Sequence, residues 1–181
     1  MLPKLQLQFK QIEQLKSDLI ESLDQINEDQ LQFRIQPDSW NRLQVVQHLV
    51  IVEERTLAYM EKKINSFPDA KNIEWTASIR SAFLILIQRL PFKYKVPTKR
   101  VAPEGDLVYS DLKQEWQSIR QKLQNFLEQF TTENVHFPIL RHPIVGMLSI
   151  PQTLRFIEEH FKRHLKQFGR ISAAEKKANN G

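Results

Sequence analysis

The sequence of 181 residues contains no cysteine. This absence excludes disulfide bonds, thiolate metal ligands and a cysteine nucleophile, although it does not decide the redox compartment. Glycine is also scarce, with four residues against eleven phenylalanines. Because turn-rich β folds use glycine at many of their turns, this composition favours long helices. We therefore predict an all-α protein.

Long apolar runs and clusters of like charge are absent as well. No apolar run approaches the roughly 20 residues of a membrane span, and the start MLPKLQLQFKQIEQLK lacks the charged and then apolar segments of a signal peptide. We expect a cytoplasmic protein that does not bind a membrane. The formal net charge is +5, but basic residues are interleaved with acidic ones, so we expect no nucleic-acid partner.

Four segments carry apolar residues at the helical spacing of three and four. They cover roughly residues 4–27, 41–64, 106–130 and 150–172. Asn41 with Gln44 has the spacing of a capping box at the start of the second segment, and Ser149 with Gln152 repeats it at the fourth. We predict one domain over residues 1–172 that contains four long helices.

A long connection separates the second and third of these segments. Its middle, SIRSAFLILIQRL, is predicted to be a short helix, whereas Pro91, Pro97 and Pro103 favour extended backbone elsewhere. The predicted fold is therefore a four-helix bundle with a long crossover between its second and third helices. The polar tail, residues 173–181, is expected to be disordered.

Two histidines, His160 and His164, lie four positions apart in the last predicted helix. Side chains at this spacing are one turn apart on one helix face, so both imidazoles can reach one ion. Both also border the apolar stripe on the inward side of that helix. His48, between Val45 and Val52 in the second segment, likewise lies at the edge of an apolar face.

The three histidines allow two interpretations. Three imidazoles that converge in a bundle would leave positions open for water or substrate, as in catalytic metal sites. Alternatively, each imidazole forms an ordinary hydrogen bond with a neighbouring side chain, as most histidines beside an apolar stripe do. Spacing alone does not decide, because a chain with five histidines can contain such a pair by chance.

Three stretches carry a family resemblance: WNRLQVVQH at 40–48, HPIVGMLS at 142–149 and HFKRH at 160–164, which Gln167 follows. Together with the segment KYKVPTKRVAP, they resemble the motifs of the DinB/YfiT-like superfamily, over about residues 5–172. Asn41 stands where the family usually has Ser or Thr, and Gln44 where it has Glu. Both replacements can still cap a helix.

The resemblance implies a four-helix bundle that holds a divalent ion, zinc or nickel, through three histidines. Transferred position by position, these are His48, His160 and His164, the same three that the spacing selects. Members of the superfamily resemble thiol-dependent transferases and isomerases that use bacillithiol, mycothiol or glutathione. In those, the metal would lower the pKa of the thiol and hold a thiolate nucleophile.

The resemblance leaves other functions open. Some members are described as metal-dependent hydrolases, in which a metal-bound water would be the nucleophile. Either enzyme would act on a small-molecule substrate. A third alternative is a non-catalytic metal-binding or interaction module, and because relatives resemble dimers, a homodimer is also expected.

The sequence identifies no general base. Phe161 stands where the helix of a zincin protease carries its catalytic Glu. Four acidic residues are near the ligands in sequence, and we interpret all of them as solvated charges: Glu53, Glu54, Glu158 and Glu159.

Three further residues belong to no ligand set. His142 opens the segment before the last helix, and we favour a structural role through a backbone hydrogen bond over a place at the rim of the site. His136 is in no motif. Trp40 is interpreted as a packing residue at the start of its helix.

Overall fold

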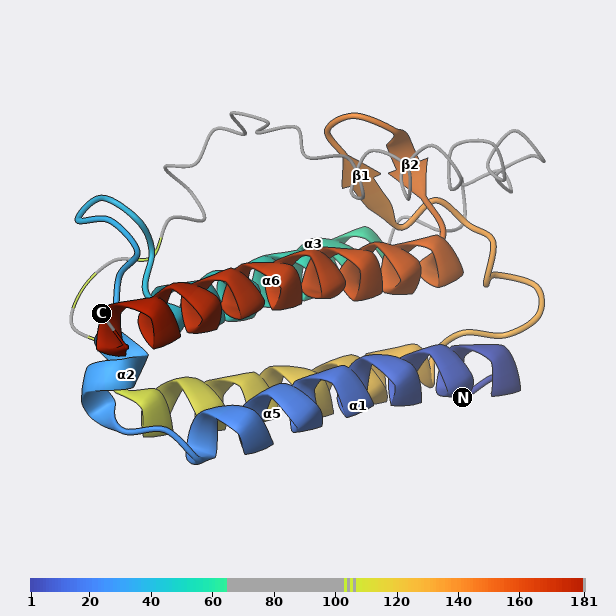
Figure 1. Ribbon diagram of the computed structural model, residues 1–181. Coiled ribbons are helices and arrows are strands. Elements are labelled where there is room, and N and C mark those ends of the chain that lie inside the picture. Colours follow the sequence, from blue (N-terminus) through green and yellow to red (C-terminus); the bar gives the residue numbers. More distant parts are fainter. Residues whose placement is uncertain (65–102, 104, 106, 181) are drawn as a thin grey trace.

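The computed structural model describes residues 1–64, 103, 105 and 107–180 (Figure 1). The elements in this part of the chain are α1 (Pro3–Asp24), α2 (Glu28–Gln32), α3 (Arg42–Ile64), α5 (Tyr109–Leu127), β1 (Leu140–His142), β2 (Gly146–Leu148) and α6 (Ile150–Asn179). Helices dominate, and the two strands are three residues each. The prediction of an all-α protein is confirmed.

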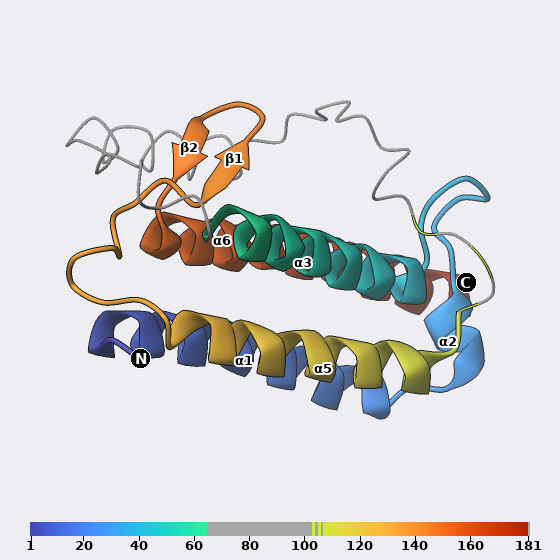
Figure 2. The ribbon, with the colours of Figure 1, turned by 180° about the vertical axis from the view of Figure 1, so that it is seen from behind.

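The long helices α1, α3, α5 and α6 pack side by side. Helix α1 contacts α5 and α6, and α3 contacts the same two helices. Figure 2 shows α3 and α6 as one layer and α1 and α5 as the other. None of the helices in the described ranges has the length and apolarity that a membrane span requires.

Helices α3 and α5 run in the same direction (Figure 1), which is the orientation that the expected crossover requires. The connecting residues 65–102, 104 and 106, including the short helix expected over 78–90, lie outside the described residues. The crossover and the complete helix count therefore stay predictions.

The apolar stripes read from the sequence form the core. In α1 the buried members are Leu5, Phe9, Ile12, Leu19 and Leu23, and α5 contributes Leu112, Trp116, Ile119, Leu123 and Phe126. Full burial of one such side chain stabilises the fold by about 1.5–3 kcal/mol. Packing of these stripes is therefore what holds the helices together.

Two capping boxes set the starts of the helices that carry the histidines. Before α3, the backbone N–H of Asn41 donates to Gln44 Oε1 at 3.1 Å, and the backbone N–H of Gln44 donates to Asn41 Oδ1 at 2.9 Å. Ser149 and Gln152 form the same reciprocal arrangement before α6. Both predicted caps are present, and they fix where each helix begins.

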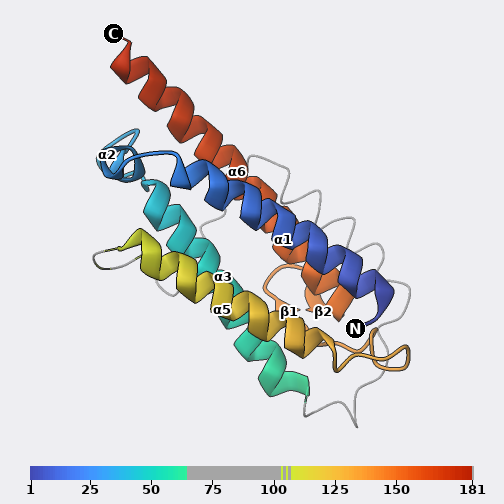
Figure 3. The ribbon, with the colours of Figure 1, turned by 90° about the horizontal axis from the view of Figure 1, so that it is seen from below.

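Helix α6 does not end near residue 172 as the sequence suggested. It continues to Asn179, and its last turns project beyond α1 (Figure 3). The reason is a buried ion pair: Arg42 donates to Glu175 Oε2 at 2.8 Å and to Ser172 Oγ at 3.0 Å. The expectation of a disordered tail is thus wrong for residues 173–179. The polar composition of the tail gives no indication that Glu175 has a buried partner.

A short antiparallel hairpin precedes α6, with Leu140 opposite Leu148 and His142 opposite Gly146. Gly146 has a φ of +77°, a left-handed conformation that glycine adopts at little cost at the end of a three-residue loop. The sequence predicted no strand in this segment. The hairpin places His142 beside the first turns of α6.

Candidate metal centre

The structure brings His48, His160 and His164 together between α3 and α6. Their ring centroids are 5.3 Å apart for His48 and His160, 4.8 Å for His48 and His164, and 4.7 Å for His160 and His164. His48 is buried with 8% of its surface exposed, and the other two are half-buried. The side chains that the sequence singled out as candidate ligands therefore converge on one point inside the bundle.

The nitrogen positions fit a single cation. One ring nitrogen from each histidine lies within 4.8 Å of the other two, and the Nε2 atoms of His48 and His160 are 3.4 Å apart. Two imidazole ligands of a tetrahedral ion, each about 2.0–2.1 Å from it, are about 3.4 Å apart. A hydrogen bond between two of the rings would engage the lone pair of only one nitrogen. A cation can accept a lone pair from each of the three rings.

Burial favours the neutral form of His160 and His164. It lowers the pKa of His160 well below the ordinary value, and the neighbouring His164 and His48 lower it further. Burial, followed by the effect of His48, lowers the pKa of His164 to about 4. Only a neutral imidazole has a lone pair to offer a metal, so both rings are ready to ligate at neutral pH.

Aromatic rings and an amide surround the three histidines. Trp40 contacts His48 with ring centroids 5.1 Å apart, and Phe156 stacks on His160 at 5.8 Å. Gln167 Oε1 lies 2.9 Å from His164 Nδ1. The interpretation of Trp40 as a packing residue agrees with this contact, which also makes it one wall of the site.

His142 has the structural role that the sequence favoured. Its Nδ1 accepts hydrogen bonds from the backbone N–H groups of Ile144 at 3.2 Å and Val145 at 3.4 Å. The His142 ring also packs edge-on against Phe156, with ring centroids 5.1 Å apart, and Phe156 in turn stacks on His160. His142 therefore holds the hairpin turn and is not one of the three converging rings.

Of the remaining candidates, His136 is exposed. It stays outside the group of converging histidines. It is therefore a suitable control residue for the site.

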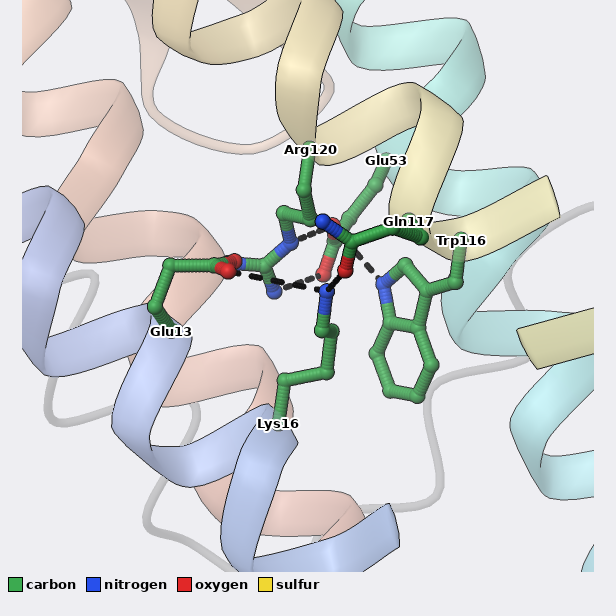
Figure 4. A network of polar contacts seen from close by, with 6 residues as sticks. All are labelled: Glu13, Lys16, Glu53, Trp116, Gln117 and Arg120. Atoms are coloured by element: carbon green, nitrogen blue, oxygen red, sulfur yellow. Dashed lines mark hydrogen bonds and ion pairs between the residues drawn. The ribbon is translucent and has the colours of Figure 1, made fainter. Parts of the chain in front are cut away.

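The interpretation of Glu53 as a solvated charge is wrong. Glu53 is buried and accepts from Arg120 Nε at 2.6 Å, from Arg120 Nη2 at 2.7 Å and from Trp116 Nε1 at 3.1 Å (Figure 4). An isolated buried carboxylate is unfavourable, and these three donors offset its desolvation. The partners come from α5, and helical spacing within α3 gave no sign of them.

The polar network continues onto α1. Arg120 Nη1 donates to Glu13 Oε1 at 3.1 Å, and Lys16 Nζ donates to Gln117 Oε1 at 2.7 Å while lying 3.5 Å from Glu13 Oε2 (Figure 4). Burial lowers the pKa of Lys16. Sequence reasoning missed this network, because Lys16 and Arg120 occupy positions beside apolar stripes where long basic side chains usually reach water.

One ring contact links this network to the histidine helix. Trp116, which donates to Glu53, stacks on Phe161 with ring centroids 5.5 Å apart and planes 20° apart. Phe161 follows His160 directly in α6 and is completely buried. Phe161, which stands where zincins carry a catalytic Glu, therefore has a packing role in this chain.

The other acidic residues divide into two kinds. Glu54 is exposed, as expected. Glu159 is buried with 6% of its surface exposed, so its interpretation as a solvated charge is wrong. Glu158 and Glu159 both contact Lys162 in ion pairs along α6.

The comparisons with known proteins identify one family. The sequence model of the DinB superfamily matches residues 11–168, which includes all three converging histidines. No curated protein shows significant sequence similarity to the chain.

Proposed function

The chain belongs to the DinB superfamily, and from this premise we propose that it is a divalent-metal-dependent enzyme. The proposed ligands are His48, His160 and His164. The observation that carries the proposal is the convergence of their ring nitrogens within 4.8 Å of one another. A site built from three imidazoles leaves at least one coordination position for a substrate, as catalytic sites require.

The donor set fits zinc or nickel, because imidazole is a borderline ligand that suits both ions. The chemistry that such an ion supplies when bound is Lewis acidity, which lowers the pKa of a thiol or a water molecule and favours a thiolate or hydroxide nucleophile. The three neutral histidines bring no negative charge. The ion's charge is therefore left to attract an anionic ligand into the open position.

We place thiol-dependent S-transfer ahead of hydrolysis. Both oxygens of Glu53 are occupied by Arg120 and Trp116, and Glu158 and Glu159 are paired with Lys162. The partners of these three carboxylates disfavour a role as general base, and the fourth acidic residue near the ligands in sequence, Glu54, is exposed to solvent. The free pKa of a thiol is about 8.5, against about 15.7 for water, so a thiol bound to the ion ionises without a protein base more readily than water does, which supports the transferase.

The proposed cosubstrate is a low-molecular-weight thiol, and the proposed compartment is the cytoplasm, where such thiols are kept reduced. A second, small-molecule substrate would receive the thiolate. The residues at the site do not distinguish among thiols.

A thermal-shift measurement tests this proposal. Glutathione, bacillithiol or mycothiol should raise the melting temperature of the zinc-loaded protein far more than that of the metal-free protein, because the ion is the anchor for the thiol. The His48→Ala variant, treated with the same zinc concentration, is the control and should lose the difference. Equal shifts with and without zinc would contradict thiol binding at the ion and would favour the hydrolase or the non-catalytic module.

A further inference from the structure

Gln167 contacts one of the three converging histidines. Its side-chain oxygen Oε1 lies 2.9 Å from Nδ1 of His164, and both residues are on α6, three positions apart. This separation is that of a good hydrogen bond between a nitrogen donor and an oxygen acceptor.

The direction of this hydrogen bond follows from the atoms. An amide oxygen accepts only, so the proton between the two atoms must be on Nδ1 of His164. A neutral imidazole has one ring proton, and its lone pair then lies on Nε2. The opposite amide orientation would donate to Nδ1 and leave a proton on the nitrogen that a metal needs.

We propose that Gln167 is a positioning residue that holds His164 in the Nδ1–H tautomer, with the Nε2 lone pair available to a metal ion. The proposal rests on the proposed metal site, because its functional consequence is metal affinity. Partners of this kind, which contact a ligand rather than the ion, typically contribute 10–100-fold to affinity, an order-of-magnitude range of about 1.4–2.7 kcal/mol.

The arrangement of the other two rings supports the assignment. His48 and His160 approach each other through their Nε2 atoms at 3.4 Å, and His164 is within 4.8 Å of both through its own ligating nitrogen. Because Nδ1 of His164 is engaged with Gln167, Nε2 is the nitrogen that remains for the shared site. All three histidines would then ligate through equivalent atoms.

The first test uses the metal-free protein. Nitrogen-15 NMR of labelled histidine at pH 7 should report His164 as the Nδ1–H tautomer in the wild type and in Gln167→Glu, whose carboxylate is also an acceptor. In Gln167→Met, which keeps the side-chain length but removes the acceptor, the Nε2–H tautomer should appear. An Nε2–H tautomer in the wild type would overturn the proposal.

The second test measures zinc affinity by competition with a chelator. Gln167→Met should bind about 10–100-fold more weakly than the wild type, whereas Gln167→Glu should bind at least as tightly. The exposed neighbour Lys166 supplies the matched control, Lys166→Met, which should not change affinity. Unchanged affinity in Gln167→Met would overturn the role of Gln167.

The two failures are distinguishable. If the wild type binds no zinc at all, the proposed function fails, while the tautomer of the metal-free protein is still measured by NMR. If the wild type binds zinc and the tautomer is insensitive to residue 167, the metal site stands and the positioning role of Gln167 does not.

Discussion

Arg120 donates two parallel hydrogen bonds to the carboxylate of Glu53, from Nε at 2.6 Å and from Nη2 at 2.7 Å. The side chains are 1% and 4% exposed, so water screens neither charge. A bidentate arrangement is the geometry in which such a pair offsets most of its desolvation. It joins α3 to α5, and Trp116 extends the contact to Phe161 beside the histidines.

Glu53→Gln should lower the free energy of unfolding by about 3–5 kcal/mol, because it leaves the Arg120 charge buried without its main partner. Urea denaturation monitored by circular dichroism measures the change. Lys113→Met is the control, because the ion pair of Lys113 with Asp24 is about 40% exposed and should contribute less than about 1 kcal/mol. Equal losses in the two variants would contradict a stabilising role for the buried pair.

Local patterns predicted the helices well. The stripe of α1 and the caps at Asn41 and Ser149 depend on residues three and four positions apart. The residues that form each of these features are therefore close together in the sequence. The histidine pair of α6 is also local. His48 was found because it too borders an apolar face, and the structure brings it to the other two.

Long-range polar pairs could not be predicted in the same way. Glu53 and Arg120 are 67 positions apart, and Arg42 and Glu175 are 133 apart. Each residue alone has the appearance of an ordinary surface charge, and only the packing of the helices reveals its partner. The errors over Glu53 and over the C-terminal tail have this common cause.

Stability of the metal-free protein should fall as pH decreases below 6.5. The folded state holds the pKa of His164 at about 4 and that of His160 well below 6.5, so the unfolded chain takes up these protons first. Between pH 6.5 and 4 the free energy of unfolding should decrease by up to about 1.4 kcal/mol per pH unit for each histidine. Urea titrations at several pH values measure it.

The His164→Gln variant provides the control for this pH dependence, since it removes one of the histidines whose pKa is lowered in the folded state. Its stability should change less steeply over the same range. A slope identical to that of the wild type would show that His164 does not protonate on unfolding in this interval.

Metal affinity should depend on all three histidines. Replacing His48, His160 or His164 with Ala should weaken zinc binding by more than about 100-fold, because loss of a ligand costs more than loss of a residue that orients one. His136→Ala should leave it unchanged. Chelator competition measures each constant, and a wild-type affinity in any of the three single variants would remove that residue from the site.

Removal of residues 173–181 should destabilise the protein, although these residues are mostly polar. Arg42, which is 3% exposed in the intact protein, would lose the carboxylate of Glu175. We expect a loss of about 3–5 kcal/mol in the free energy of unfolding. Removal of residues 178–181 alone, which leaves Glu175 in place, should have little effect. Similar stability of both truncated chains would contradict the role of this ion pair.

Trp40 should report metal binding directly, because its ring centroid lies 5.1 Å from that of His48. Nickel is paramagnetic in most imidazole complexes and quenches indole fluorescence at short range, whereas zinc does not. Titration with nickel should therefore quench part of the fluorescence and saturate at one ion per chain, and excess zinc should restore the signal.

The chain has three tryptophans, so the assignment needs Trp40→Phe, which keeps an aromatic ring against His48. This variant should bind nickel with a similar affinity, as measured by calorimetry, but should lose most of the quenching. If the quenching is undiminished in Trp40→Phe, nickel binds away from His48, and the three-histidine site is not where the ion resides.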